Sequence, residues 1–249
     1  MRNSDRPDLG RGGPLEQLER YPFTLGVLLA NLILFGFCAW KSGGPGVDAG
    51  ILVDLGSNVR SLLPTEPWRL ITSAFLHVDL IHLVLNSWAL FSIGRLLEVH
   101  YGTARTWVLY LLCALAGSLA SAAWQQLRGQ DAISAGASGG VFGLIFLGWC
   151  YARSAPERLG SLAEQLRGWI VVLALWTGFL LLASRGLVDH AAHLGGGLAG
   201  ALLGTLVRPR PGADAHPAWT ALAHVAALGT LLCFAAVVWT LRSGGRLPG

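Results

Sequence analysis

Charged side chains are scarce in this sequence. Asp, Glu, Lys and Arg make up 13% of its 249 residues, against roughly a quarter in typical soluble domains. Hydrophobic residues make up 53%, and the mean hydropathy is +0.53. A water-soluble enzyme needs a more polar surface than this composition provides, so the sequence predicts a protein that is embedded in a membrane.

Cysteine is also rare, and the four cysteines show no spacing that is typical of a metal site. Each falls inside an apolar stretch, where a free cysteine behaves as a small packing residue. We therefore predict neither a disulfide nor a bound metal. The four residues are Cys38, Cys113, Cys150 and Cys233.

Basic residues exceed acidic ones, with a formal net charge of +4 and a sequence pI near 9.2. No DNA- or RNA-binding motif accompanies this charge, so its expected partner is the anionic surface of the lipid bilayer and not nucleic acid. Lys41 is the one lysine among 18 basic residues. Such a preference for arginine suggests a GC-rich bacterial genome, and hence a multi-pass protein of the bacterial inner membrane.

Long apolar runs recur along the chain, most of them near the length that crosses a bilayer as a helix. The sequence therefore predicts an all-α polytopic membrane protein with seven spans. The expected spans are Phe23–Trp40, Ile81–Leu97, Thr106–Trp124, Ser138–Tyr151, Trp169–Ala183, Ala191–Val207 and Trp219–Leu241.

These spans divide the chain into three parts. Residues 1–20 mix charged residues with Gly and Pro and should form a flexible tail. Residues 21–210 should form a six-helix core, and residues 211–249 a linker, the seventh helix and a short C-terminal tail. Arginines are more frequent in the segments that share the side of the N-terminus, which places that terminus in the cytoplasm.

Polar side chains inside the predicted spans or next to their ends form three clusters. Such groups are costly at membrane depth, and they usually face a cavity or a partner. Hydrogen bonds between packed helices could account for one such cluster. Three clusters that together supply a hydroxyl, imidazoles and an amide favour a functional site. Their members are His77, His82 and Asn86, then Ser138, then His190 and His193.

The segment GASGG, residues 136–140, fits the G-x-S-x-G pattern that exposes the nucleophile of α/β-hydrolases. That interpretation requires a preceding strand and a soluble sheet, and an open sheet edge cannot lie in lipid. Ser138 instead opens a short apolar span. A short span leaves room for a water-filled cavity above the serine, below the membrane surface.

Several motifs in this order resemble the rhomboid family of intramembrane serine proteases, from Pro67 to Val207. They are PWR at 67–69, HVDLIHLVLN at 77–86, Glu98 followed by Tyr101-Gly102, GASGGVFG at 136–143 and AHLGGGLAG at 192–200. The resemblance implies a six-helix core that cleaves peptide bonds in or near the transmembrane segments of other membrane proteins. It implies no metal and no organic cofactor.

The resemblance implies a catalytic dyad of Ser138 and His193, in which the imidazole takes the proton of the hydroxyl. It also implies that His82 and Asn86 line an oxyanion hole. These two residues are four positions apart, so they share one helix face, and both can donate hydrogen bonds. The backbone N–H of Ser138 is a third expected donor.

Glycines should let the helices that carry the dyad approach closely. We expect them to pack the fourth span against the sixth, with Phe142 on the imidazole of His193. The glycines at the site are Gly136, Gly139, Gly143, Gly196 and Gly200, and Gly204 continues their stripe.

Other motif residues are expected to support the structure without taking part in the chemistry. Asp189 precedes His193 by four residues and could suggest a triad, but a solvated carboxylate or a pair with Arg185 is the preferred interpretation. The supporting residues are Trp68, Arg69, His77, Arg95 and Glu98, with Trp68 and Arg69 in a long loop that braces the core.

Three alternatives stay open from sequence alone. One is a non-catalytic rhomboid-like protein that binds membrane clients, although such relatives lose the serine or the histidine. Another is a rhomboid relative of the sorting type that trims C-terminal anchors. The third is a transporter built around intramembrane histidines, which would be expected to show internal repeats.

Overall fold

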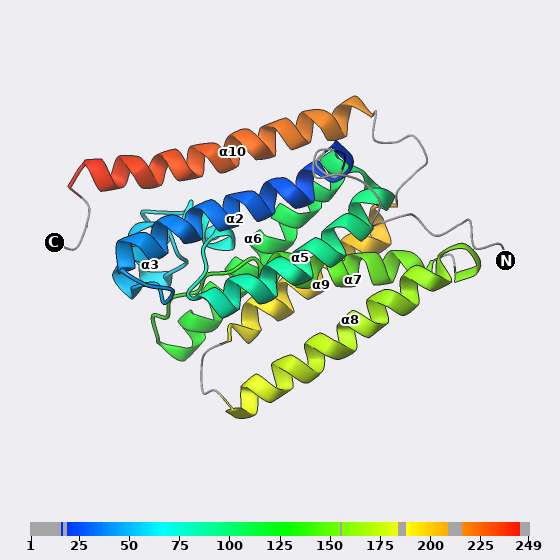
Figure 1. Cartoon of the computed structure of the whole chain (residues 1–249), viewed down its shortest axis with the longest axis horizontal. Coiled ribbons are helices and arrows are strands. Elements are labelled where there is room, and N and C mark those ends of the chain that lie inside the picture. Colours follow the sequence, from blue (N-terminus) through cyan, green and yellow to red (C-terminus); the bar gives the residue numbers. More distant parts are fainter. Residues whose placement is uncertain (1–15, 17–18, 155, 184–187, 209–215, 245–249) are drawn as a thin grey trace.

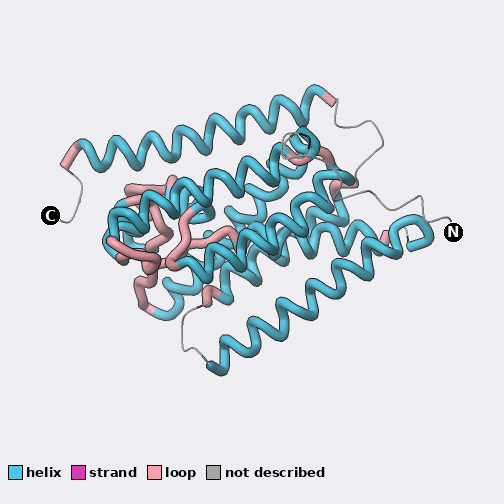
Figure 2. Tube along the Cα trace, viewed as in Figure 1, coloured by secondary structure: helices cyan, strands magenta, loops and turns pink. Residues whose placement is uncertain are grey.

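The structure is a computed structural model that describes residues 16, 19–154, 156–183, 188–208 and 216–244. These residues form helices joined by loops, and none of them lies in a strand (Figures 1 and 2). Two isolated antiparallel bridges, Gly46 with Asp79 and Asn58 with Ser134, join loop segments. The predicted all-α fold is confirmed.

Among the described residues, seven long helices correspond to the seven predicted spans. Four of them, α2, α5, α6 and α10, are long and apolar enough to cross a membrane, whereas α7 and α9 have 16 and 17 residues. The helices are α2 (Pro22–Ser42), α5 (Leu80–Tyr101), α6 (Thr103–Arg128), α7 (Ser138–Arg153), α8 (Pro156–Ala183), α9 (His190–Leu206) and α10 (Pro217–Arg242).

Helix α7 lies at the centre of the bundle. It packs most closely against α9 and α6, and its other neighbours include α8 and α5. Leu144, Ile145 and Leu147 are fully buried, so the middle of this helix is enclosed by protein and not by lipid. The surrounding helices therefore fix the position of α7.

Helix α8 is longer than the sequence predicted. It begins at Pro156, whereas the expected span began at Trp169. The reason is packing: Leu162 and Leu166, one turn apart, are buried against the core although the polar residues Glu164 and Gln165 lie between them. A polar stretch that the hydropathy pattern excluded from the span is therefore helical. In Figure 1, α8 and α10 lie on opposite sides of the bundle.

The start of α2 is fixed by Glu98 near the end of α5. Its carboxylate accepts hydrogen bonds from the backbone N–H groups of Phe23 and Thr24, and from the hydroxyls of Thr24 and Thr103, at 2.7–3.0 Å. The first N–H groups of a helix have no partner within it, and the helix dipole stabilises a negative charge at this end. Glu98 is the structural cap that the sequence suggested.

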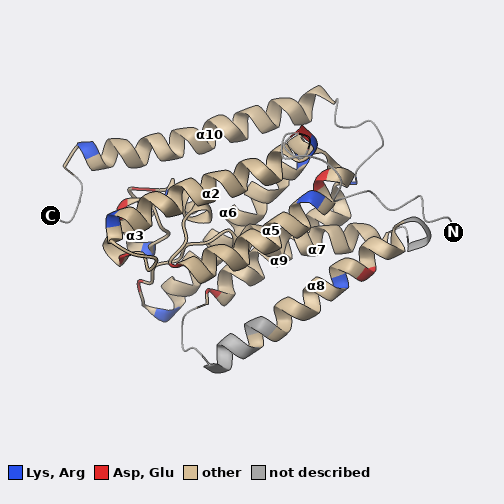
Figure 3. Cartoon of the chain, viewed as in Figure 1, with Lys and Arg blue, Asp and Glu red and all other residues tan. Residues whose placement is uncertain are grey.

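Charged residues of the described part of the chain lie toward the two ends of the bundle, and the band between them is uncharged (Figure 3). Such a band is expected of a protein that crosses a bilayer. The predicted flexible tail, residues 1–20, falls almost wholly outside the described residues. The same is true of most of the linker before α10 and of residues 245–249.

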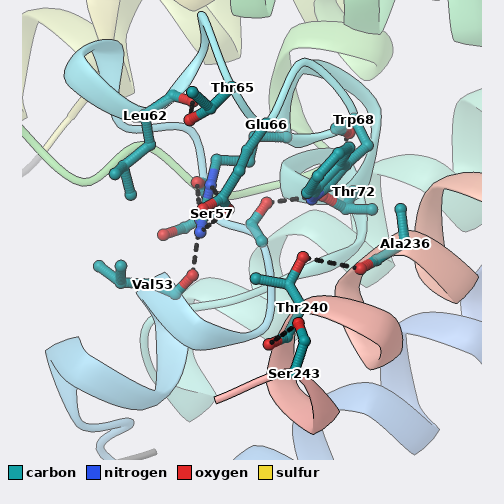
Figure 4. A network of polar contacts seen from close by, with 12 residues as sticks. Val53, Ser57, Leu62, Thr65, Glu66, Trp68, Thr72, Ala236, Thr240 and Ser243 are labelled. Atoms are coloured by element: carbon teal, nitrogen blue, oxygen red, sulfur yellow. Dashed lines mark hydrogen bonds and ion pairs between the residues drawn. The ribbon is translucent and has the colours of Figure 1, made fainter. Parts of the chain in front are cut away.

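The long connection between α2 and α5 folds into short helices, which Figure 2 shows among loops. Arg69 holds it together: its guanidinium donates to the carbonyl oxygens of Val53 and Ser57 at 2.6 and 2.9 Å and pairs with Glu66 (Figure 4). Arg69 is buried, which agrees with its expected structural role. The short helices are α3 (Ala49–Asp54), η2 (Arg60–Leu62), α4 (Arg69–Thr72) and η3 (Ser73–Phe75).

Candidate active site

Ser138 is the first residue of α7, and the loop before it makes a sharp turn. Gly136 has φ of +143°, a conformation that an L side chain rarely adopts. Its N–H donates to the carbonyl oxygen of Ser73 at 2.9 Å, so the turn is tied to the long connection. Because α7 begins at Ser138, the N–H groups of its first turn have no partner within the helix and can face an anion.

His193 lies in the first turn of α9, which Asp189 caps by accepting a hydrogen bond from the N–H of Ala192 at 2.9 Å. Nε2 of His193 lies 2.8 Å from Oγ of Ser138. The structure thus brings together two side chains that are 55 residues apart in sequence. That distance suits proton transfer from hydroxyl to imidazole.

A seam of glycines allows the two helices to meet. A Cβ atom placed on Gly196 would overlap the backbone carbonyl of Gly139, and one on Gly200 would overlap the carbonyl of Gly143. Neither position has room for a side chain. The helices can pack this closely only because both sides of the seam lack one.

Gly204 continues the seam, because its Cβ would overlap the carbonyl of Leu147. Helix α6 also belongs to it. A Cβ on Gly117 would lie 2.8 Å from the carbonyl oxygen of Ala192 and 3.4 Å from Cα of Gly139. The sequence interpretation missed Gly117, although the run of small residues around it, from Ala114 to Ala123, gave the signal.

Phe142 lies beside the imidazole, as its position one turn after Ser138 suggested. The two rings are parallel within 10°, with centroids 4.0 Å apart. His190, the other histidine of this helix start, meets His193 edge to face at a centroid distance of 6.5 Å. The ring of His193 is therefore held on one face by Phe142.

His82 and Asn86 lie on α5. The ring of His82 faces the turn at Gly136, just before Ser138. The ring of His82 covers Gly136: its Nε2 lies 2.9 Å from where a Cβ on that glycine would stand, and Oγ of Ser138 lies 3.7 Å from the same point. The side-chain amide of Asn86 donates to the carbonyl oxygen of His82 at 3.0 Å. One N–H of this amide is so engaged, and the other can face a ligand.

Asp189 does not complete a triad. One carboxylate oxygen accepts from the α9 backbone and the other from the hydroxyl of Ser121. Nδ1 of His193 has no hydrogen-bond partner among the described residues. Arg185, suggested as a partner for Asp189, lies outside the described residues.

His77 stays apart from the dyad. It is fully buried in the loop before α5 and meets the ring of His82 edge to face, with centroids 5.2 Å apart. Burial, with a further contribution from His82, lowers its pKa from 6.5 to about 3. His77 is therefore neutral at pH 7, and it supports the imidazole that covers Gly136.

Two residues that hold the serine loop escaped the sequence interpretation. Asn58 pairs with Ser134 through two backbone hydrogen bonds of 2.9 Å, and Ser73 accepts from Gly136. The amide of Asn58 also donates to the carbonyl oxygen of Ser118 on α6 at 2.9 Å. No sequence signal marks these contacts, because they are made largely by the backbone.

Within the described part of the chain, no three His, Cys, Asp or Glu side chains lie close enough to hold a metal ion. The four cysteines are free thiols, and Cys38 and Cys113 are buried. Cys113 packs against Gly143, next to the glycine seam.

Comparison with known proteins bears on this arrangement. The family model of the Rhomboid domain matches residues 64–210, more than half of the chain, including every residue of the site described above except Asn58. Rhomboid protease GluP of Bacillus subtilis is 32% identical over 178 residues, which cover 71% of this chain and 33% of that protein.

RHOMBOID-like protein 5 of Arabidopsis thaliana is 36% identical over 176 residues, covering 68% of this chain and 52% of that protein. Rhomboid-like protease 1 of Toxoplasma gondii is 29% identical over 194 residues, covering 78% of this chain and 64% of that protein. The chain thus spans between about a third and two thirds of the length of these relatives. It belongs to the rhomboid family of integral membrane proteins.

Proposed function

We propose that this chain is an intramembrane serine endopeptidase, with Ser138 as nucleophile and His193 as general base. Its substrates are other membrane proteins, cut in or next to a transmembrane segment. The single observation that carries the proposal is the 2.8 Å approach of Nε2 of His193 to Oγ of Ser138. The names of the relatives in Bacillus subtilis and Toxoplasma gondii, both of which are called proteases, support it.

The proposed reaction has two halves. In the first, Oγ of Ser138 attacks the peptide carbonyl carbon while its proton moves to Nε2 of His193. The tetrahedral intermediate then collapses, the imidazolium gives its proton to the leaving amine, and an acyl-enzyme remains. In the second half His193 takes a proton from water as the water oxygen attacks the ester carbonyl carbon. The bond between that carbon and Oγ then breaks, the imidazolium returns the proton to Oγ of Ser138, and the other part of the substrate leaves as a carboxylic acid.

The oxyanion of the tetrahedral intermediate needs donors that are already in place. The candidates are the N–H of Ser138 at the start of α7, the ring of His82, and the second amide N–H of Asn86. One well-placed donor contributes roughly 10²–10³ in rate. Parallel stacking on Phe142 limits rotation of the imidazole, which keeps Nε2 directed at Oγ.

The reaction also needs water inside the membrane. Helix α7 has 16 residues, which at 1.5 Å per residue reaches only about 24 Å, less than the ~30 Å hydrocarbon core. With the other end of α7 at the opposite interface, Ser138 lies several ångströms below the surface. We place the N-terminus in the cytoplasm and this site near the outer face of a bacterial inner membrane, following the arginine distribution.

The proposal is tested with purified protein in liposomes and a panel of single-span substrates, beside Ser138→Ala. We expect cleavage by the wild type alone. A fluorophosphonate should label Ser138, and His193→Ala should remove this labelling. Equal cleavage by wild type and Ser138→Ala would rule out the serine mechanism, and a wild type that neither cuts nor takes the label would leave a client-binding protein.

A further inference from the structure

Helix α10 touches the rest of the protein at few places. Of its described residues only Thr230 and Val237 are buried, as expected of a helix that mostly faces lipid. An apolar cleft of about 590 Å³ separates its first half from α2, with α6 forming the third wall. The contacts that α10 does make are therefore informative.

The second half of α10 packs on the long connection between α2 and α5. The ring of Phe234 meets Phe75 edge to face, with centroids 5.7 Å apart. Cγ2 of Val237 lies 3.1 Å from the point where a Cβ on Gly56 would stand. Figure 4 shows the end of α10 beside this network, in which the hydroxyl of Thr72 donates to the carbonyl oxygen of Gly56.

Helix α10 also packs on α6. Gly56 and Phe75, the two residues of the connection described above, lie close in sequence to the tethers of the serine loop. Gly56 is two residues from Asn58, whose backbone pairs with Ser134. Phe75 is two residues from Ser73, whose carbonyl oxygen accepts from the N–H of Gly136. Gly136 in turn is two residues from Ser138. Contacts and two-residue backbone segments therefore alternate along a path from α10 to Ser138.

We infer that α10 is a positioning element of the active site, and that Phe234 and Val237 are its positioning residues. They press the connection against the core, so that Asn58 and Ser73 hold the serine loop in place. Loss of a small packing contact on α10 can therefore lower the rate strongly, because a 1 Å misplacement of a reacting group can cost about 10²-fold. This inference rests on the proposed function for its kinetic readout.

The structural readout does not depend on activity. The amides of Ser134 and Gly136 are the two whose hydrogen bonds tie the loop, so their hydrogen–deuterium exchange reports on the tether. In the full-length protein we expect Val237→Ala and Phe234→Ala to speed exchange at these two amides about fivefold or more. Val238→Ala is the matched control, since Val238 is the next residue and is 48% exposed.

The kinetic readout separates positioning from general loss of structure. Both variants should lower kcat roughly threefold to tenfold, below the ~10²-fold cost of a full 1 Å shift, and leave KM near its wild-type value. Val237→Thr keeps the branched shape and should restore both measurements. Should Val237→Ala not fold, Phe234→Leu serves the same comparison, because it keeps an apolar side chain and removes the aromatic contact.

Exchange at Ser134 and Gly136 that matches the Val238→Ala control in both α10 variants would overturn the inference. Were the wild type inactive on every substrate and label, the proposed function would fail, and the exchange data would still decide whether α10 holds the loop.

Discussion

The imidazole of His193 lies flat against the ring of Phe142, 4.0 Å between centroids and 10° from parallel. A ring held on one face has fewer orientations, so Nε2 stays aimed at Oγ of Ser138 without a third side chain on Nδ1. Under the proposed mechanism, Phe142 takes the orienting role that a carboxylate has in a triad.

Removing this ring should slow the reaction. Aromatic pairs contribute about 0.5–1.5 kcal/mol beyond burial, so we expect Phe142→Ala to lower kcat and the rate of Ser138 labelling roughly twofold to tenfold. Phe142→Tyr should retain most activity. Phe146→Ala is the control, because Phe146 lies one turn further along α7 and packs on Gly197. Equal losses in the two alanine variants would show that the effect is not specific to the stack.

A single methyl group in the glycine seam should separate the dyad. Gly196→Ala places a Cβ on the carbonyl of Gly139, so α9 must move away from α7. Because a shift of ~1 Å can cost about 10²-fold, we expect normal membrane insertion with most cleavage and labelling lost. Labelling at the wild-type rate would contradict this role for the seam.

The control for that experiment is Gly36→Ala. No atom lies within 4 Å of a Cβ at Gly36 on α2, so this variant should behave as the wild type does. Gly204, although further from Ser138, is unsuitable because it packs on Leu147 in the same seam.

Loss of an oxyanion donor should appear in kcat and not in KM, since the contact strengthens in the transition state. We expect His82→Ala and Asn86→Ala each to lower kcat by up to roughly 10²–10³. Ser92→Ala controls for the hydrogen bond that Asn86 makes within α5, because the Ser92 hydroxyl donates to the carbonyl of Trp88, also four residues back. A change in KM alone would indicate that Asn86 binds the substrate and does not stabilise the oxyanion.

Acid should destabilise the fold through His77. Its pKa falls from 6.5 to about 3 on folding, so below pH 6.5 the unfolded chain binds a proton that the folded chain excludes. The contribution of His77 to the free energy of unfolding is then fully present above pH 6.5. It decreases as the pH falls toward 3, by up to about 1.4 kcal/mol per pH unit. Thermal unfolding between pH 7.5 and 4.5 measures the slope.

The slope should be shallower in His77→Gln, which cannot titrate in this range. His224→Gln is the control, because His224 is exposed on α10. A pH dependence of unfolding that is the same in wild type and His77→Gln would assign the acid sensitivity to other groups.

Hydropathy and motif order were enough to predict the seven long helices and to name the residues that meet at the site. Apolar runs are a local signal, and they locate the helices. The glycine stripes within the motifs have a fixed spacing, and they indicate which helices approach each other. The family resemblance paired Ser138 with His193, and the helical spacing placed Phe142 one turn after Ser138.

Contacts made by the backbone could not be predicted in this way. The bridge between Asn58 and Ser134 depends on loop geometry and leaves no pattern in residue type. The extension of α8 to Pro156 depends on Leu162 and Leu166 finding a partner surface, which hydropathy does not report. Asp189 looked like a solvated or paired carboxylate, and only the structure shows it as the cap of α9.

The separation of 55 residues between Ser138 and His193 also bears on how the protein is made. During synthesis the serine leaves the ribosome well before the histidine, and α8 must enter the membrane between them. Under the proposed mechanism the nascent chain carries a serine without a base until α9 has docked into the glycine seam. Under the same mechanism, the growing chain would therefore not cut the membrane proteins that are being inserted around it.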